Sequence, residues 1–489
     1  MQVFVLVLVL GVVAGDVLRE QADWQWTAGW KVIAGIAVAR LMVISAYALL
    51  AAMTYRRLAG PKAHTAVRTM DRFGGVYRLA ILSLFLIEIA VGVLTRVRGV
   101  LGGDWVLIDE LLVMLPPLLM VVWGWWWYYP IDRRLREAAI LRQLDQGAAL
   151  PTVWTRGQYL LAQLRHQLLL MLAPLMLLMA WAETAPLLVP HLPEVVSPVP
   201  MEVWQLMGAG LIFLFAPLMI RAMWDTSPLP PGEVRDALLT MCKRTGVRVR
   251  ELLLWRTFGG MINAAVMGLI GPLRYILLTD ALLNGLPRRQ VEAVMAHELA
   301  HVVKHHTFWL ITAAFAMLAG LQLFWVVVYE LIVTALSTES TGWMGDAGRL
   351  LRDQTVADTV TLSAGFLCWL LAFGWVSRRF ERQADAFAVQ YLSRLEQEQR
   401  SDAAEGNPII TAAAVHAMTH ALQLVAELNH INIIRKSWRH GSIAWRQDQL
   451  QKTVGQPIDA LRINRTVLWV KIAAASLAAG LVALAAAGF

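Results

Sequence analysis

Two histidines and a glutamate in the middle of the chain have the spacing of a zinc site. His297 and His301 are four residues apart, and Glu298 follows the first of them in the pattern HExxH. On an α-helix, residues four apart share a face, so both imidazoles can bind one metal ion. Glu298 can then take a proton from a metal-activated water molecule that attacks a peptide carbonyl. The pattern predicts zinc-dependent peptide hydrolysis with Glu298 as general base.

A catalytic zinc site needs a third protein ligand. His305 is eight residues beyond His297, which is about 12 Å along a helix axis and too far for one ion. We therefore expect His305 and the adjacent His306 to be solvated or interfacial. Glu381 is the better candidate, and Asp385, one helical turn later, can orient a ligand histidine. A solvated run of charges at a helix end is the alternative reading of this second segment.

The composition is that of a membrane protein. Hydrophobic residues make up 58% of the 489 residues, charged residues only 16%, and the mean hydropathy is +0.54. We expect nine spans, near Met1–Ala14, Trp30–Met53, Val76–Leu94, Val106–Tyr129, Gln163–Ala185, Val203–Met223, Phe308–Leu336, Val356–Val376 and Val467–Phe489. A signal peptide is the alternative for the first run, although no Lys or Arg precedes it.

The loops between these runs alternate between basic and non-basic. Lys and Arg crowd the stretch 56–78 and the stretch after Pro130, whereas 186–202 has none. Because basic loops favour the cytoplasmic side, segments 221–307 and 377–465 are predicted to face the cytoplasm. Both halves of the candidate site lie in these segments. The chain is therefore expected in a bacterial inner membrane, with its active site facing the cytoplasm.

Other features restrict the class of partner. No basic run is interleaved with aromatics, so a nucleic-acid partner is not expected. Two cysteines, Cys242 and Cys368, do not make a disulfide framework. The aromatic run Trp123–Tyr129 indicates an interfacial belt in the lipid bilayer. Arg40 and Glu88 fall inside spans, where we expect them to pair or to face water.

The segment before the HExxH helix has the pattern of a small α+β module. Pro228–Gly232 indicates a linker, and the helix that begins at Pro287 is predicted to run straight into the next span. A helix is expected at Glu233–Arg244, and strands are expected at Val247–Trp255, Asn263–Val266 and Tyr275–Thr279. The predicted fold is a mainly α-helical polytopic membrane protein with a small zincin-type catalytic module on the cytoplasmic side.

This fold divides the chain into five segments. An N-terminal membrane region of about six spans precedes a catalytic module in two parts, which are separated by a two-span hairpin and followed by a last span. The predicted bounds are 1–225, 226–307, 308–376, 377–465 and 466–489.

From about Leu229 to Leu450 the sequence resembles the M48 family of membrane zinc metallopeptidases, which includes the Ste24-type CaaX prenyl proteases and the HtpX-type quality-control proteases. The resemblance is carried by Asn263-Ala264 with Gly268, Ile276–Leu286, Val291–His301 and Glu381–Asp385. It implies one zinc ion per chain, with Glu381 as third ligand and Glu298 as base. It also implies that the strand around Asn263 pairs with an extended substrate.

The same resemblance suggests roles for two residues near the end of the module. Family members carry a His-Pro segment with an arginine six residues after the histidine, and His440 and Arg446 have that spacing. His440 is expected to donate to the oxyanion, and Arg446 to order the carboxylates of the site. Gly441 stands where the family has proline.

Three functions fit these features unequally. The first is an endopeptidase acting on membrane or membrane-associated proteins, and prenylated peptides and misfolded proteins both suit it as substrates. The second is a non-catalytic scaffold or sensor with a structural zinc, which would have no need of Glu298. The third, a metal transporter, would place its ligands within the spans. The sequence leaves the oligomeric state open.

Overall fold

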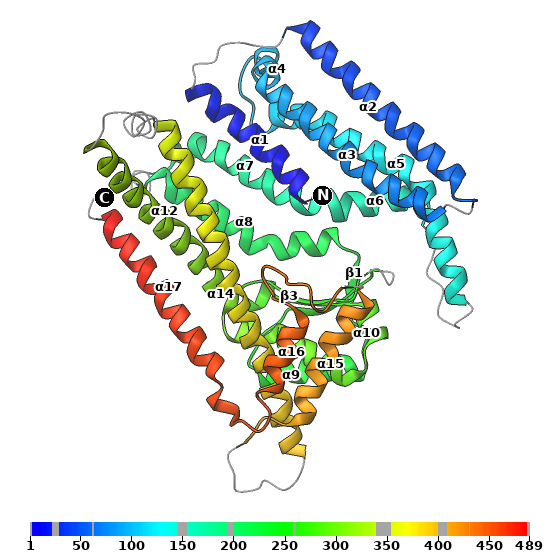
Figure 1. Cartoon of the computed structure of the whole chain (residues 1–489), viewed down its shortest axis with the longest axis vertical. Helices are drawn as coiled ribbons and strands as arrows, with labels where there is room; N and C mark the ends of the chain where they lie inside the picture. Colours follow the sequence, from blue (N-terminus) through cyan, green and yellow to red (C-terminus); the bar gives the residue numbers. More distant parts are fainter. Residues whose placement is uncertain are drawn as a thin grey trace. The chain divides into compact units, whose positions relative to one another are not determined.

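The computed structural model describes residues 2–21, 29–60, 63–144, 154–193, 199–257, 261–338, 354–399, 408–429 and 431–486. The chain divides into two compact units, Met1–Asp225 and Thr226–Phe489, each with its own apolar core. Both units are mainly helical, and the second also contains a small sheet (Figure 1). Met1 and residues 487–489, which belong to the first and last predicted spans, lie outside the described residues.

The first unit consists of helices. They are α1 (Gln2–Gln21), α2 (Trp30–Arg57), α3 (Ala63–Ala90), α4 (Val93–Leu101), α5 (Ile108–Leu144), α6 (Arg156–Gln163), the π-helix η1 (Leu164–Leu169), α7 (Leu170–Leu188), the 3-10 helix η2 (Val189–His191) and α8 (Met201–Met223). Helices α2, α3 and α5 pack against one another. Arg40 on α2 forms an ion pair with Glu88 on α3, which confirms the expected pairing of these intramembrane charges.

Eight of the predicted spans are found among the described residues as helices long and apolar enough to cross a membrane. They are Trp30–Arg57, Thr65–Ala90, Ile108–Glu137, Arg156–His191, Met201–Met223, His306–Ala335, Val356–Gln399 and Ile458–Leu484. The N-terminal helix has an apolar stretch of only Phe4–Gly15, so its crossing stays a prediction. These helices confirm a polytopic membrane protein.

The sheet of the second unit has four strands in the order β1-β2-β4-β3. They are β1 (Thr226–Pro228), β2 (Glu251–Trp255), β3 (Ala264–Met267) and β4 (Tyr275–Thr279). Strand β4 is buried along its whole length and pairs parallel with β2 and antiparallel with β3. Strand β1 occupies an edge, where Pro228 is tolerated because its missing N–H is not needed by a further strand. The sequence reading had placed Pro228 in a linker and missed this strand.

Helices surround the sheet and continue into the spans of this unit. They are α9 (Glu233–Arg244), η3 (Gly271–Leu273), α10 (Asp280–Gly285), α11 (Arg288–Val303), α12 (His306–Thr338), α14 (Gln354–Gln399), α15 (Ala412–Leu428), α16 (Ile443–Gln451), η4 (Ile458–Ala460) and α17 (Arg462–Ala486). Helices α12, α14 and α17 pack side by side (Figure 1). Helix α14 is long enough to form a span and then to extend into the soluble module.

The HExxH helix does not run straight into the next span, so that prediction was wrong. Helix α11 ends at Val303, and His305 has a φ of 53°, in the left-handed region that a helix cannot continue through. Helix α12 then begins at His306. The break redirects the chain and, as shown below, turns His306 back towards the site.

Candidate metal centre

Helix α11 presents the HExxH residues from a rigid, buried position. Pro287 stands at its N-cap, and small or apolar side chains, among them Ala296, Leu299 and Ala300, are fully buried in the core of the unit. Helix α11 packs against α14 along this buried side. His297 and His301 therefore project from a helix whose place relative to α14 is fixed by core packing.

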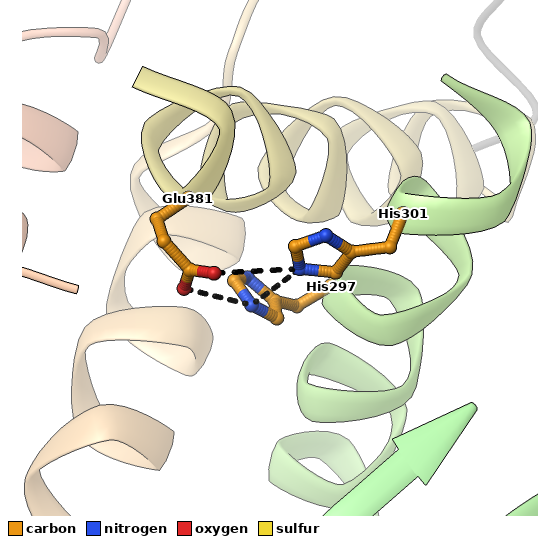
Figure 2. Close-up of side chains that lie close together, drawn as sticks. All are labelled: His297, His301 and Glu381. Carbon is orange, nitrogen blue, oxygen red and sulfur yellow. Dashed lines mark hydrogen bonds and ion pairs between the residues drawn. The ribbon is translucent and has the colours of Figure 1, made fainter. Parts of the chain in front are cut away.

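The structure brings His297, His301 and Glu381 together (Figure 2). The two Nε2 atoms are 3.4 Å apart, and the Glu381 carboxylate oxygens lie 3.7 Å from Nε2 of His297 and 3.8 Å from Nε2 of His301. Zinc ligands at about 2.0–2.1 Å from a tetrahedral centre are about 3.4 Å from one another. The three side chains therefore fit a zinc ion held between α11 and α14.

Asp385 and Arg446 support one side of this group. Nδ1 of His297 lies 2.9 Å from Oδ1 of Asp385, one turn beyond Glu381 on α14. Arg446, on α16, donates to both oxygens of Asp385, from Nε at 2.8 Å and from Nη2 at 2.6 Å. The third guanidinium nitrogen, Nη1, is 3.8 Å from Glu381. The bidentate contact from Arg446 orients the Asp385 carboxylate, and this carboxylate in turn orients the ring of His297.

His306 supports the other ligand histidine, contrary to the expectation that it would be solvated or interfacial. Its side chain is fully buried and stacks on Phe380. Its Nδ1 lies 3.0 Å from Nδ1 of His301, and its Nε2 lies 2.9 Å from Oε1 of Gln383. The break after Val303 produces this contact. His305, by contrast, is exposed.

The partners of His306 determine which nitrogen of His301 faces the metal site. The amide nitrogen of Gln383 donates to Oδ1 of Asn464 at 2.9 Å, so its oxygen is left to accept from Nε2–H of His306. Neutral His306 then accepts at Nδ1, and His301 must donate from Nδ1. The Nε2 lone pair of His301 is thereby directed at Glu381 and His297. We call the chain of side chains His301–His306–Gln383–Asn464 the relay.

Glu298 lies on the side of α11 that faces the edge strand β3. The backbone N–H of Val266 bonds its carboxylate, and burial raises the pKa of Glu298 to about 7 against the opposing charges of His297 and Arg446. Burial likewise lowers the pKa of His301 to about 3, so its ring is neutral at neutral pH. A carboxyl that titrates near neutrality can both accept and return a proton.

His440 borders the metal group. Nδ1 of His440 is 2.9 Å from Oε2 of Glu381, and the His440 side chain is about half exposed. Gly441 has a φ of 77°, which proline cannot adopt, so its turn differs from that of a His-Pro segment. Asn263 is exposed immediately before β3, and its backbone bonds Thr279 of β4.

The sequence analysis missed three residues around the metal group: His306, Gln383 and Asn464. Gln383 is 77 residues from His306 and 81 residues from Asn464. His306 carried a weak signal. It follows His301 by only five residues, so a break in the helix between them could bring the two rings together. No pattern in the sequence marks Gln383 or Asn464.

Comparison with known proteins agrees with this geometry over part of the chain. Residues 250–421 match the model of Peptidase family M48. Protease HtpX of Xanthomonas oryzae pv. oryzae (strain PXO99A) is 25% identical over 171 residues, which are 35% of this chain and 56% of that protein. Protease HtpX of Xanthomonas campestris pv. campestris (strain B100) is 24% identical over 159 residues, 32% of this chain and 52% of the relative.

The chain thus spans about half the length of the curated relatives it matches. The crystal structure of S. mikatae Ste24p aligns with 87% of this chain and all of that chain, at 17% identity and a TM-score of 0.39, too low to establish a shared overall fold. The matched segment includes His297, Glu298, His301, Glu381 and Asp385, whereas His440 and Arg446 lie beyond it. Residues 250–421 therefore resemble Peptidase family M48, within an integral membrane protein with eight candidate spans among its described residues.

Proposed function

We propose that this protein is a zinc-dependent endopeptidase that cleaves membrane or membrane-associated proteins, with one zinc per chain. The observation that carries the proposal is the meeting of two Nε2 atoms and one carboxylate beside Glu298. Among the described residues only three side chains form this group, and three protein ligands leave a position for a reacting molecule, whereas structural zinc sites use four. A scaffold with a structural zinc would explain neither the position left open by three protein ligands nor the presence of Glu298.

His297, His301 and Glu381 would hold the metal. When bound, zinc supplies a Lewis acid that activates water and polarises the peptide carbonyl. Glu298 takes the proton of the attacking water and returns it to the leaving amine, which its near-neutral pKa suits. His440, half exposed beside Glu381, would donate a hydrogen bond to the oxyanion. Asp385 and Arg446 hold the ring of His297.

The substrate would lie along β3 as an added strand. Strand β3 pairs on one side with β4, and in the described sheet no strand covers its other side. That side faces Glu298, because the N–H of Val266 reaches its carboxylate. An extended peptide paired with the β3 edge, starting at Asn263, would present its backbone to the metal group. Prenylated peptides and misfolded membrane proteins both fit this mode.

The proposed setting is a bacterial inner membrane with the site facing the cytoplasm. Its support is the alternation of basic and non-basic loops along the eight candidate spans.

The test compares Glu298→Gln with wild type in the full-length protein. We expect cleavage of an unfolded protein substrate to fall by roughly 10²–10⁴-fold, the usual contribution of a general base, with zinc content unchanged. Glu292→Gln, on the same helix but paired with Arg288, is the matched control and should cleave normally. Membrane proteomics of cells with Glu298→Gln would identify uncut substrates. Wild-type cleavage by Glu298→Gln would refute the proposal.

A further inference from the structure

The first unit contains a cavity of about 710 Å³ lined by basic and aromatic side chains. It lies where α2 ends, where the candidate span of α5 ends, and where α6 begins. Its charged lining consists of four arginines and one carboxylate: Arg56, Arg133, Arg134, Arg156 and Glu137. The volume is in the range of small-molecule sites.

The charges of this lining do not balance. Glu137 is taken up by Arg133, 2.8 Å away. Among the described residues, no carboxylate pairs with Arg56, Arg134 or Arg156, so three guanidinium groups face the cavity without a counter-ion. Nε of Arg156 is also buried without a hydrogen-bond partner. Such a group is costly unless an anion completes it.

Two of these arginines form cation–π contacts with aromatic rings. The guanidinium of Arg134 lies 4.9 Å from the ring centre of Tyr55. That of Arg156 lies 4.5 Å from Trp126 and 5.3 Å from Tyr129. Stacking uses the flat face of a guanidinium and leaves its N–H edge free, and that edge matches the oxygens of a phosphate.

The position of the cavity along the spans indicates the source of the anion. The candidate span of α5 ends at Glu137 and the next candidate span begins at Arg156, so we expect the cavity at one membrane face. Tryptophan and tyrosine concentrate at the level of lipid headgroups, and basic pockets between spans bind anionic headgroups. We propose that this cavity binds the phosphate group of an anionic phospholipid. The site is independent of the metal centre and of the proposed protease activity.

The test titrates the full-length protein in detergent with phosphatidylglycerol and with phosphatidylcholine of the same chain length, using native mass spectrometry. Wild type should bind phosphatidylglycerol more tightly. The variant Arg134→Gln/Arg156→Gln should weaken that binding roughly 30-fold, since each arginine near a charged lipid contributes about 1 kcal/mol. The control Arg68→Gln/Arg72→Gln removes the same charge from exposed positions of α3 outside the cavity and should change little.

Three outcomes would overturn the inference. They are equal binding of both lipids, equal loss in the control, and displacement of the lipid by inorganic phosphate, which would make free phosphate the ligand. If the glutamine pair does not fold, Arg134→Lys/Arg156→Lys keeps the charges but loses the planar edge. That pair should still weaken phosphatidylglycerol binding at an unchanged melting temperature, and unchanged binding would count against the site.

Discussion

Two clusters in this chain gather three carboxylates around one arginine, and each contains a group with the geometry of a metal site. The Arg98 cluster of the first unit consists of Arg98, Asp104, Asp109 and Glu110. The Arg446 cluster of the second unit consists of Arg446, Glu298, Glu381 and Asp385. Their formal charges are the same, and yet we assign a metal only to the second.

The difference lies in what the arginine contacts. Arg98 reaches all three carboxylates, with Nη2 at 2.7 Å from Glu110 and 3.5 Å from Asp104, and a contact from Nε to Asp109. The positive charge that a metal would bring to these carboxylates is therefore already supplied by Arg98. Arg446 instead donates to both oxygens of Asp385, lies 3.8 Å from Glu381, and leaves that carboxylate to face the Nε2 atoms of two histidines. Histidines, which carry a lone pair without a charge, turn such a cluster into a zinc site.

Zinc content gives the largest expected contrast between the two clusters. His301→Ala removes one of three ligands, so we expect zinc affinity to fall by more than the roughly 100-fold that loss of an outer partner can cause. Asp109→Asn should leave one zinc per chain. Elemental analysis of the purified variants measures both, and zinc loss in Asp109→Asn would break the comparison.

Removing each arginine should separate stability from metal binding. Arg446→Met and Arg98→Met each leave buried carboxylates without a counter-charge. We expect each to lower the free energy of unfolding of the metal-free protein by about 3–5 kcal/mol. Only Arg446→Met should also lower the affinity for zinc, by roughly 10–100-fold. Melting curves and competitive chelation report the two effects. Lys452→Ala, which breaks an exposed pair with Asp448, should show neither.

The relay offers a finer test, because the Arg98 cluster has no equivalent of it. His306→Phe keeps the stacking on Phe380 but cannot accept from Nδ1 of His301, so zinc affinity should fall about tenfold. The neighbour His305→Asn is the control, since asparagine tolerates the same left-handed backbone. Equal affinities in wild type and His306→Phe would show that the relay does not orient the ligand.

The smallest expected effect is the pH dependence of zinc affinity, which again concerns only the cluster with histidines. Burial lowers the pKa of His297, but the hydrogen bond and charge of Asp385 outweigh it and raise the pKa above its usual value. Zinc must therefore displace a proton wherever the His297 ring is protonated, and zinc affinity should rise with pH up to that pKa and level off above it. Asp385→Asn lowers the pKa and should reduce proton release. Calorimetry in two buffers of different ionisation heat measures the release.

Local patterns predicted the parts of the fold that local interactions determine. Helix Glu233–Arg244 and strand Tyr275–Thr279 have the predicted bounds, and eight apolar runs became candidate spans. The convergence of Glu381 with the HExxH helix followed from its position beyond two crossings.

What escaped prediction depends on long-range contacts. Strand β1 has three residues and exists only because β2 lies beside it. The break at His305 and the burial of His306 depend on Phe380 and Gln383, which are distant in the sequence. The π-helix at Leu164–Leu169 has no signal in the sequence. Strand β1 and the break at His305 are tertiary effects that override local propensity.

The long separation between His301 and Arg446 has a consequence for the newly made chain. Their 145-residue spacing (446 minus 301) means that the ribosome releases the two histidines well before the arginine that secures them. At about 5–20 residues per second, the interval is about 7–30 s. Asn464 emerges later still. A nascent chain therefore carries an incomplete site while its own spans are being inserted, and under the proposed function it could not yet cleave a neighbouring polypeptide at the translocon.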